Sequence, residues 1–595
     1  MAYKSLQDCI DDLDKSGQLI RIKEEVDPYL EMAAIHLRIF EAKGKAVLFE
    51  KVKGSKYQAV SNLFGTTERS EFIFRDSLEN VKKMIALKSD PMQALKKPFQ
   101  NISVAFAAFK ALPKKVTSHH FEKIKISDLP QIQCWEKDGG AFVTLPIVYS
   151  EDADKTGVMH SNLGMYRIQL SGNEYVKDKE IGLHYQLHRG IGVHQTKWNN
   201  LGKPMKVSIF IGGPPSHSFA AVMPLPEGLS ELTFAGALGG RRFRYLYDED
   251  GFCLSTDADF VITGEVYPNE VKPEGPFGDH LGYYSLKHDF PLMRVNNVYA
   301  KKNAIWSFTV VGRPPQEDTA FGNMIHEMTG SAISTEIPGL HEVHAVDAAG
   351  VHPLLLAIGS ERYTPYYENK QPQELLTIAN HILGTGQLSL AKFLFIANKS
   401  DDEHLKTHDE EKFFQHILER IDLSRDIHFQ TKTTIDTLDY SGDGLNTGSK
   451  VIIATCGEKK RELIDKLPQD FVLPEAFKNP KLITKGILAV ELDNERISEL
   501  TNAVKEMPNI NRIPLIIICD DADFLAKDFN IFLWVTFTRS NPSHDIYGIN
   551  ERFENKHWCC DTLIIDARIK PHHAPVLEKN VAIEKRVDEI LKSYL

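Results

Sequence analysis

The sequence predicts a multi-domain α/β protein with a β-rich middle region, and three observations lead to this fold class. The chain has 595 residues, whereas a single hydrophobic core rarely serves more than about 250–300 residues. Strand and helix patterns alternate in the first hundred residues and again beyond Thr319. Between about Ser118 and Val311, short β-rich runs are separated by Gly and Pro, and few helix patterns fit. Alternating segments of this kind favour α/β domains on either side of a β domain.

The N-terminal region combines helix and strand patterns. Residues 1–19 follow an amphipathic helix pattern that ends at Gly17. A second helix is expected from Leu30 to Ala42, where Gly44 stops it, and a strand from Ala46 to Phe49, which is bounded by Gly54. We therefore expect an α/β domain in residues 1–117.

The middle region, residues 118–318, is expected to be a β domain. Apolar runs such as Val207–Ile211 and Phe260–Thr263 are typical of strands, and Gly and Pro residues such as those of 212–215 separate them. The connections between these runs are long, and long ordered connections commonly carry function.

The C-terminal part contains an internal repeat. The segment Arg420–Ile427 (RIDLSRDI) resembles Arg539–Ile546 (RSNPSHDI), and an apolar strand pattern precedes each one, at Phe393–Ala397 and at Leu515–Cys519. This predicts two copies of one strand–helix–strand module, which gives an α/β domain in residues 319–455 and a further α/β domain in 456–595. Chance similarity between two α/β segments is the alternative.

Composition excludes several classes of protein. The net charge of −11 argues against nucleic acid as a partner. The N-terminus lacks the apolar core of a signal peptide, and no later stretch approaches the ~20 apolar residues of a membrane span. Seven scattered cysteines indicate reduced thiols, so we expect a cytoplasmic protein.

Two acidic residues lie in the turn Pro273–His280 (PEGPFGDH). Gly and Pro separate Glu274 from Asp279, so the segment cannot be helical. A rigid loop with two acids suits acid–base chemistry, because one acid can stay ionised beside a cation while the other holds and returns a proton. An ordinary surface turn is the alternative.

Three further segments carry polar side chains: Asn162–Arg167 (NLGMYR), His184–Gly190 (HYQLHRG) and Leu229–Glu231 (LSE). Arg167 could hold a substrate carboxylate by two parallel hydrogen bonds, or keep a neighbouring acid ionised. The Asn, His and Glu of these segments offer ligands suited to Mn²⁺ or Mg²⁺, but their spacing does not show that they converge. A dinucleotide fingerprint, a phosphate-binding Gly-Lys-Ser/Thr loop and a nucleophile elbow are all missing from the sequence.

These segments together resemble the UbiD family of decarboxylases, which use prenylated FMN. The stretch PEGPFGDHLGYY at residues 273–284 is similar to the family's central signature, and NLGMYR at 162–167 to its metal- and flavin-contacting segment. His188-Arg189-Gly190 and PLPEGLSE at 224–231 resemble the other two binding segments, and DGGAFVTLP at 138–146 also fits. The motifs occur in the family's order, and the similarity extends from residue 1 to about 455.

The resemblance implies a split β-barrel in the middle domain that holds the flavin. It implies Mn²⁺ or Mg²⁺ at Asn162, His188 and Glu231, bridging to the cofactor phosphate, with K⁺ nearby. It makes Arg167, Glu274 and Asp279 the catalytic residues. Its cofactor contacts are Met165, Tyr166, Arg167, His184, Tyr185, Gln186, Arg189 and Gly190, together with Lys392 at the phosphate. His184 departs from an Arg that some members have.

Chemistry explains why such an enzyme needs this cofactor. Loss of CO₂ from an sp² carbon would leave an unstabilised anion, so a cofactor rather than a covalent bond to a side chain has to take up the electrons. By the resemblance, the azomethine ylide of the prenylated flavin adds to the substrate's double bond and serves as this electron sink. Asp279 is then the expected proton donor, with its pKa raised in the occupied, dry site, while Arg167 and Glu274 tune its acidity.

The resulting hypothesis is reversible, non-oxidative decarboxylation of an aromatic or α,β-unsaturated acid. The leading substrate is a quinone precursor, either a 4-hydroxy-3-polyprenylbenzoate or a dihydroxynaphthoate. A catabolic aromatic acid decarboxylase and a non-catalytic flavin-binding protein on the same fold are the alternatives. We expect a flavin prenyltransferase to supply the cofactor, a lipophilic substrate to bring peripheral membrane association, and the chain to form a homo-oligomer, a dimer or higher.

Overall fold

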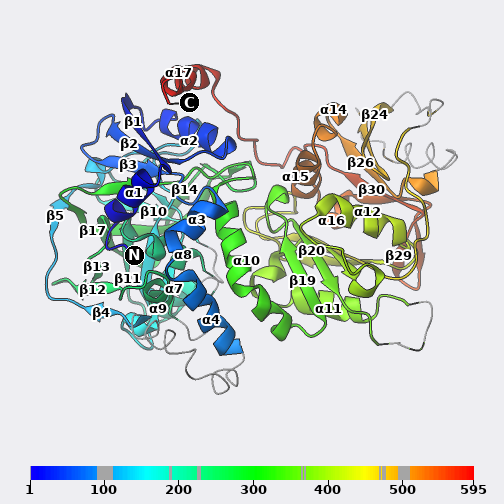
Figure 1. Cartoon of the computed structure of the whole chain (residues 1–595), viewed down its shortest axis with the longest axis horizontal. Coiled ribbons are helices and arrows are strands. Elements are labelled where there is room, and N and C mark those ends of the chain that lie inside the picture. Colours follow the sequence, from blue (N-terminus) through cyan, green and yellow to red (C-terminus); the bar gives the residue numbers. More distant parts are fainter. Residues whose placement is uncertain are drawn as a thin grey trace. The chain divides into compact units, whose positions relative to one another are not determined.

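The computed structural model describes residues 2–89, 111–185, 190–223, 225, 230–363, 366, 370–467, 471, 477–492, 497 and 510–594. Contacts divide the chain into two compact units (Figure 1). Unit 1 comprises Met1–Asp279, Tyr283–Thr329 and Val576–Leu595, and unit 2 comprises His280–Gly282 and Gly330–Pro575. Both combine helices with several sheets, as the predicted fold class requires.

The N-terminal part of unit 1 is an α/β layer. Its sheet has the order β1-β2-β3-β18, formed by Leu19–Val26, Ala46–Val52, Gln58–Ser61 and Ile305–Ser307. The predicted helices are α1 (Leu6–Lys15) and α2 (Glu31–Glu41), and the predicted strand is β2. Ser5 caps α1 by accepting a hydrogen bond from the Asp8 backbone, and Gly17 follows its end with φ +73°, a conformation that favours glycine. Helices α3 (Thr67–Phe74) and α4 (Leu78–Ser89) follow.

The last helix of the chain, α17 (Val581–Leu591), belongs to unit 1 and packs on α2 (Figure 1). Arg38 of α2 donates to Glu584 at 2.5 Å and to Asp588 at 2.6 Å. Residues 576–595, which lie within the segment 456–595 expected to form a further α/β domain, belong to unit 1.

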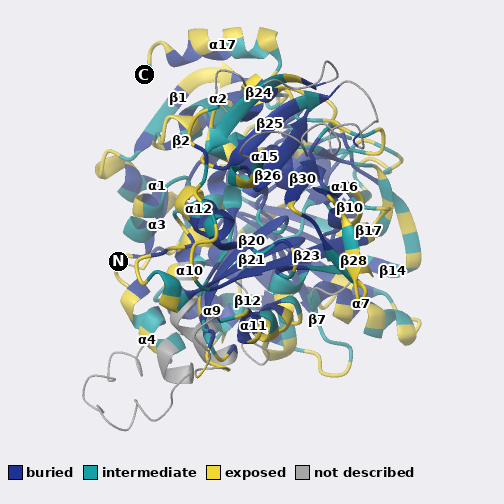
Figure 2. Cartoon of the chain, turned by 90° about the vertical axis from the view of Figure 1, so that its right-hand side faces the viewer, coloured by how far each residue is buried: buried dark blue, intermediate teal, exposed yellow. Residues whose placement is uncertain are grey.

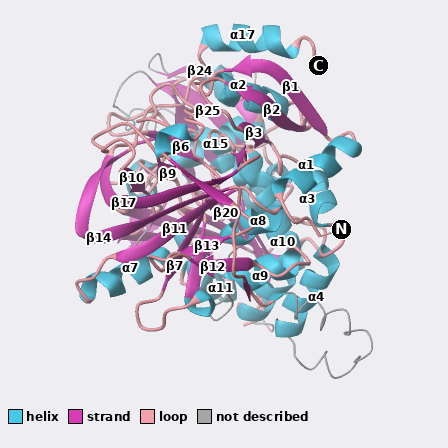
Figure 3. Ribbon diagram, turned by 90° about the vertical axis from the view of Figure 1, so that its left-hand side faces the viewer, coloured by secondary structure: helices cyan, strands magenta, loops and turns pink. Residues whose placement is uncertain are grey.

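The middle of unit 1 is a nine-stranded antiparallel sheet that forms a half-barrel, in keeping with the expected split β-barrel. The order is β6-β9-β10-β17-β14-β11-β7-β8, with β5 paired to β17. Strands β14 and β17 are long and curved (Figure 3). In chain order the strands are Phe121–Ile124 (β5), Phe142–Val143 (β6), Ile147–Glu151 (β7), Ser161–Gly164 (β8), Ile168–Gln169 (β9), Glu180–Leu183 (β10), Met205–Ile211 (β11), Phe260–Glu274 (β14) and His288–Lys301 (β17).

Helices and small sheets surround the half-barrel. The helices are α7 (Gly190–Asn200), α8 (Pro215–Val222), α9 (Glu231–Leu238) and α10 (Glu317–Glu336). One small sheet has the order β13-β12-β4, from Cys253–Ser255, Arg244–Tyr247 and Lys114–Lys115, and another pairs β15 (Phe277–Gly278) with β16 (Tyr284–Ser285). Short 3-10 helices lie at Ile126–Asp128 (η2) and Val158–His160 (η3).

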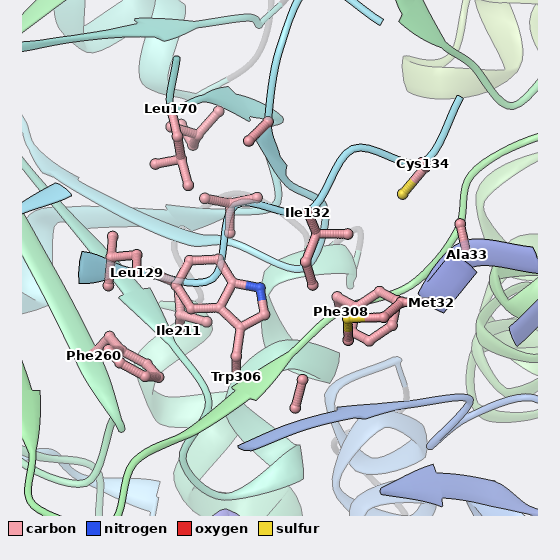
Figure 4. Packing of buried hydrophobic residues seen from close by; sticks show 14 of the residues in the cluster. Met32, Ala33, Leu129, Ile132, Cys134, Leu170, Ile211, Phe260, Trp306 and Phe308 are labelled. Carbon is pink, nitrogen blue, oxygen red and sulfur yellow. The ribbon is translucent and has the colours of Figure 1, made fainter. Parts of the chain in front are cut away.

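The core of unit 1 joins the N-terminal layer to the half-barrel (Figure 4). Trp306 of β18 is fully buried, and its ring lies edge-on to Phe260 of β14 with 5.3 Å between the ring centroids. Ile211 of β11 and Met32 of α2 belong to the same cluster. Burial of each such side chain contributes about 1.5–3 kcal/mol, so the two layers stabilise each other.

The first sheet of unit 2 has the order β19-β20-β21-β23-β22. Its strands are Leu340–Ala345, Leu354–Gly359, Phe393–Asn398, Gly448–Thr455 and Ile427–Thr433, and its helices are α11 (Glu374–Leu383) and α12 (Glu410–Arg420). Strands β20, β21 and β23 pair in parallel, and the outer strands pair antiparallel. The parallel strands are buried (Figure 2). Short 3-10 helices lie at Asp347–Ala349 (η4), Gly386–Leu390 (η5) and Lys399–Asp401 (η6).

The second sheet of unit 2 repeats this topology as β24-β25-β26-β30-β27. Its strands are Phe477–Thr484, Ile487–Leu492, Leu515–Cys519, Thr562–Asp566 and Ile546–Ile549. The helices are α14 (Ala522–Leu525), α15 (Phe529–Arg539) and α16 (Pro542–Asp545), with the 3-10 helix η7 at Ile510–Arg512 and the hairpin β28 (Arg552–Glu554) and β29 (His557–Cys559).

The two repeated motifs occupy equivalent places in these sheets. Arg420 ends α12 and Arg539 ends α15, and each motif leads into an edge strand, β22 or β27. The Asp426 carboxylate accepts from the Asp422 backbone at 2.8 Å, and the Asp545 carboxylate accepts from the Asn541 backbone at 2.6 Å. This shared turn supports the interpretation of the segment as a second copy of the preceding domain.

In the part of the chain that the structure describes, no helix combines the length and apolar character that crossing a bilayer requires.

Candidate active site

Two strands and one hairpin of unit 1 hold the three residues expected to be catalytic. Arg167 lies directly before β9, Glu274 is the last residue of β14, and Asp279 follows β15. The segment from Glu274 to Asp279 contains no helix, as its Gly and Pro residues predict. Arg167 and Glu274 are more than a hundred positions apart in sequence. They meet because β9 and β14 belong to the same sheet.

The three side chains form one hydrogen-bonded cluster. The Arg167 Nε atom donates to Glu274 Oε1 at 2.8 Å, and Nη2 donates to Glu274 Oε2 at 2.7 Å. Nη1 donates to Asp279 Oδ2. Glu274 is fully buried, and the side chains of Arg167 and Asp279 are each 9% exposed. The Arg167 guanidinium also lies 4.8 Å from the centroid of the Phe277 ring, a distance at which a cation and an aromatic face attract.

His184 is a fourth member of the cluster. Its Nδ1 atom lies 3.1 Å from Glu274 Oε2, and its ring lies 4.0 Å from the Phe290 ring. Burial and the Arg167 charge lower the pKa of His184, so the imidazole is neutral at pH 7 and donates through Nδ1–H to the carboxylate. The cofactor contact that the family resemblance assigns to His184 stays a prediction beside this contact with Glu274.

The charges around Glu274 keep it ionised. Burial alone would raise the pKa of the Glu274 carboxyl, but the Arg167 charge and the hydrogen bonds from His184 and Arg167 outweigh burial and lower the pKa to about 2. One guanidinium therefore faces two carboxyl groups, and its single positive charge can neutralise only one carboxylate in full. This is the arrangement in which one acid stays ionised and the other is able to carry a proton.

Asp138 supports the loop of Asp279 and was not among the residues expected at the site. Its Oδ1 accepts from the Gly278 backbone at 2.8 Å and its Oδ2 from the Trp135 backbone at 2.9 Å. Burial raises the pKa of Asp138 to about 7, although the backbone donors oppose this shift. The segment DGGAFVTLP at 138–146, which resembles a family motif, is the signal that could have led to this acid.

Two amides fix the other half of the turn. Gln169 accepts from the Gly275 backbone at 2.9 Å, and Asn173 donates to the Gly275 carbonyl at 2.7 Å and to the Pro273 carbonyl at 3.1 Å. Gly275 has φ +85°, a conformation that favours glycine. The turn is thus held by side chains on both sides, which keeps Glu274 and Asp279 in fixed positions.

Two of the three expected metal ligands lie in one neighbourhood. Glu231 begins α9, and its Oε2 atom accepts from the backbone of Leu163, the residue after Asn162, at 3.3 Å. A Cβ atom on Gly190 would lie 2.0 Å from Asn162 Oδ1, so glycine lets the start of α7 approach this amide oxygen. Burial raises the pKa of the Glu231 carboxyl. Amide and carboxylate oxygens are suitable ligands for Mn²⁺ or Mg²⁺, so the donor set fits such an ion.

The remaining expected ligand, His188, and the expected cofactor contacts Gln186 and Arg189 lie outside the described residues. Of the other cofactor contacts, Tyr166 lies beside Asn162, with 3.3 Å between Asn162 Nδ2 and the tyrosine oxygen. The Tyr185 hydroxyl donates to Gln195. The Met165 backbone donates to Ala221 at 3.0 Å. Tyr166 thus lies in the same neighbourhood as Asn162, and the centroid of the Tyr185 ring lies 5.9 Å from that of the Tyr166 ring.

Lys392 has partners inside unit 2. Its side chain is 1% exposed, and Nζ lies 2.7 Å from Asp439 Oδ2 and 2.6 Å from the Ser441 hydroxyl. Asp439 thus balances the lysine charge without a phosphate. The phosphate contact expected of Lys392 stays a prediction.

Family models match most of the chain. The model described as the 3-octaprenyl-4-hydroxybenzoate carboxy-lyase (UbiD) N-terminal domain matches residues 10–88, its Rift-related central domain matches 108–314, and its C-terminal domain matches 319–455.

Individual proteins and structures agree with these matches. A Chlamydia pneumoniae protein that is named as a component of 4-hydroxybenzoate decarboxylase is 34% identical, covering 97% of this chain and 96% of its own length. The closed form of Sedimentibacter hydroxybenzoicus vanillic acid decarboxylase is similar with a TM-score of 0.64 and 21% identity, covering 80% of this chain and 97% of that one. An evolved dimeric form of the UbiD-class enzyme HmfF from Pelotomaculum thermopropionicum, in complex with prFMN, has a TM-score of 0.56 and 20% identity, covering 76% and 94%.

Proposed function

The chain belongs to the UbiD family of carboxy-lyases, and from this premise we propose that it decarboxylates a hydroxylated aromatic acid with the help of prenylated FMN. The observation that carries the proposal is the cluster of Arg167, Glu274 and Asp279, in which one guanidinium holds two acids of a rigid turn. A protein that only bound flavin would have no need of a positioned proton donor, so the cluster favours an enzyme over the non-catalytic alternative.

Each residue of the cluster has a role in the proposed reaction. Glu274 stays ionised and, with His184, orients Arg167. Asp279 delivers a proton to the ring carbon that has lost CO₂. A substrate carboxylate brings a further negative charge, and like charges disfavour one another, so its arrival favours the protonated form of Asp279. Asp138 acts through the Gly278 backbone as a positioning residue.

The proposed cofactor supplies, when bound, the electron sink that an aryl anion lacks. Asn162, Glu231 and His188 would hold the Mn²⁺ or Mg²⁺ that binds its phosphate, with K⁺ nearby, and Tyr166, Arg167 and Gly190 would contact the flavin. The short distance between Asn162 and Gly190 supports this arrangement, because only a residue without a side chain leaves the amide oxygen accessible there. A flavin prenyltransferase as cofactor source, a homo-oligomeric assembly and a cytoplasmic location belong to the same proposal.

For the substrate we propose a quinone precursor, a 4-hydroxy-3-polyprenylbenzoate first and a dihydroxynaphthoate second. The matching family model is described as a 3-octaprenyl-4-hydroxybenzoate carboxy-lyase, which supports the polyprenylated benzoate as the first choice. A smaller hydroxybenzoate is the alternative to a quinone precursor, because the Chlamydia pneumoniae relative is named for 4-hydroxybenzoate. A polyprenyl substrate would also bring the enzyme to a membrane surface.

The test is reconstitution with the cofactor. The full chain is co-expressed with a flavin prenyltransferase, and the bound cofactor is identified by its mass and visible spectrum. CO₂ release is then measured with polyprenylated and plain 4-hydroxybenzoate, vanillate and dihydroxynaphthoate. We expect release from a hydroxybenzoate, and none from protein made without the prenyltransferase. A protein loaded with prenylated FMN that releases no CO₂ from any of these acids would instead support the non-catalytic alternative.

A further inference from the structure

Three side chains of unit 2, outside the cluster described above, bring metal-ligand atoms together. His280, His352 and Asp436 each place one ligand atom within 4.8 Å of the others. The His352 Nδ1 atom is hydrogen-bonded to Asp436 Oδ2. The rings of His280 and His352 lie edge to face with 6.4 Å between their centroids. Among the described residues this is the one group of three His, Cys, Asp or Glu side chains that converges in this way.

Each ligand comes from a separate segment whose backbone is fixed. The His352 carbonyl accepts from the Lys392 backbone at 3.1 Å, next to β21. Val351, the residue before it, has φ +71°, which is a rare conformation for a β-branched residue and commonly marks a functional position. Asp436 lies after β22, is 3% exposed, and accepts from the Leu438 backbone through its other carboxylate oxygen at 2.9 Å.

The short segment that carries His280 is anchored in unit 2. The Leu281 carbonyl accepts from the Trp534 indole at 2.8 Å. A Cβ atom on Gly350 would lie 2.3 Å from a methyl carbon of Leu281, so glycine at position 350 lets Leu281 pack beside the segment of His352. These contacts bring the first histidine to the other two ligands without help from an ion, and they leave a site that is already formed in the protein.

From this geometry we propose that His280, His352 and Asp436 form a binding site for a divalent transition-metal ion of the zinc class. Two imidazoles and one carboxylate form a common three-residue ligand set for such ions, with a remaining position for water. Ligand atoms about 2.1 Å from a tetrahedral ion lie about 3.4 Å from one another, so side-chain rotations of small size convert the observed group into a coordination shell.

A simple hydrogen-bonded pair is the competing explanation for His352 and Asp436. Unit 2 provides such pairs for comparison: His344 Nε2 lies 3.2 Å from Glu410 Oε1, and His544 Nε2 lies 3.2 Å from Asp443 Oδ1. Neither of these pairs gains a third converging ligand among the described residues. The third ligand, His280, is therefore the observation that favours a metal site over an isolated pair.

The position of His280 gives such an ion a consequence for the proposed enzyme. His280 follows Asp279 directly in the sequence. An ion that binds His280 therefore fixes the backbone immediately after Asp279, the proposed proton donor. Binding of the ion itself does not depend on the proposed decarboxylation, and it can be measured on protein without cofactor.

The experiment measures metal content. Full-length protein made without a flavin prenyltransferase is stripped with a chelator, titrated with Zn²⁺ by calorimetry and analysed by mass spectrometry for bound metal. We expect the parent to bind about one equivalent that H352Q, D436N and H280Q lose, with affinity weakened beyond the roughly 10- to 100-fold that loss of an outer-shell partner causes. H344Q, which removes one of the histidines of a simple pair, should retain this equivalent.

A second variant separates this site from the metal proposed to bind the cofactor phosphate. E231Q alters that other ligand set and should leave the zinc equivalent at His352 unchanged. If H352Q and D436N do not fold, zinc-edge X-ray absorption of E231Q decides, since two imidazoles at about 2.0 Å are expected. Equal zinc binding by the parent and H352Q, an equal loss in H344Q, or a zinc spectrum without imidazole ligands would overturn the proposal.

Discussion

Arg167 binds Glu274 through two parallel hydrogen bonds, from Nε at 2.8 Å and from Nη2 at 2.7 Å, although 107 positions separate the two residues. A planar guanidinium and a carboxylate match in this geometry, and the pair is stronger and more directional than a single charged contact. The third guanidinium nitrogen remains directed at Asp279. The pair with Glu274 therefore fixes the orientation in which Arg167 meets the proposed proton donor.

Replacement of Arg167 by Lys tests this orientation. A lysine keeps the positive charge but cannot make two parallel bonds to Glu274 and a third to Asp279. We expect kcat of the cofactor-loaded enzyme to fall by at least about 100-fold, within the range that a positioned acid–base group contributes. Cofactor occupancy, read from the visible spectrum, has to be matched between R167K and the parent. A kcat close to that of the parent at equal occupancy would show that charge alone suffices.

Replacement of Asp279 by Asn tests the proton donor. Asparagine has nearly the same shape but no acidic proton, so we expect D279N to lose turnover by about 100- to 10,000-fold or more and to retain bound cofactor. Decarboxylation assays and the mass of the bound cofactor check the two parts separately. D289N, at an exposed acid of β17 in the same unit, is the matched control and should keep the parent rate. Turnover by D279N near the parent rate would refute the assignment.

The sequence predicted several elements and indicated Arg167, Glu274 and Asp279 as candidate residues. Periodicity and Gly punctuation placed α1, α2 and β2, and the Gly and Pro residues of 273–278 excluded a helix between the two acids. The convergence of Arg167 with these acids came from the family resemblance and not from spacing, because the separation of two residues along a chain does not determine which strands become neighbours.

The contacts that the sequence did not predict are all non-local. Asp138 binds the Gly278 backbone across 140 positions, and His184 binds Glu274 across 90 positions. The ion pair of the buried Lys392 with Asp439 is a further non-local contact, and a buried lysine needs such a charged partner. Pairings of this kind depend on side-chain direction at strand ends, which a pattern of apolar residues does not contain.

The acid stability of unit 1 should depend on Glu274. Its carboxyl has an ordinary pKa of 4.5 and a pKa of about 2 in the folded protein. A lowered pKa means that the unfolded chain takes up the proton first, so the contribution to stability is complete above pH 4.5 and is lost as pH falls toward 2. We expect the thermal unfolding midpoint of the parent to fall over this window more steeply than that of E274Q.

The same experiment includes a control and a second effect. E122Q, at an exposed residue of β5, should follow the parent at every pH. E274Q also leaves Arg167 with one carboxylate fewer in a buried position, and removal of one partner of a buried pair typically costs about 3–5 kcal/mol. E274Q is thus expected to be less stable than the parent at pH 7 and to approach it at low pH. Parallel pH curves for E274Q and the parent would contradict the assigned pKa.

The loop that carries Asp279 should be sensitive to one methyl group at Gly278. A Cβ atom at this position would lie 2.0 Å from Cδ1 of Trp135, and Trp135 is buried with its indole donating to the Val311 carbonyl at 2.8 Å. Since the ring cannot move without breaking that bond, the backbone before Asp279 has to shift. We expect G278A to lower the free energy of unfolding by about 1–3 kcal/mol, as overpacking does, and to reduce kcat more than it changes KM.

Gly322 provides the matched control for this substitution. It lies within α10, and a Cβ atom there would meet nothing within 4 Å. Alanine is about 1 kcal/mol more favourable than glycine inside a helix, so G322A should be slightly more stable than the parent with unchanged kcat. Chemical unfolding and steady-state kinetics of both variants compare the same added methyl group in a crowded and in an open position. If G278A matched G322A in both measurements, the close packing of Trp135 against the loop would have no part in placing Asp279. The support that Asp138 gives through the Gly278 backbone would then be sufficient by itself.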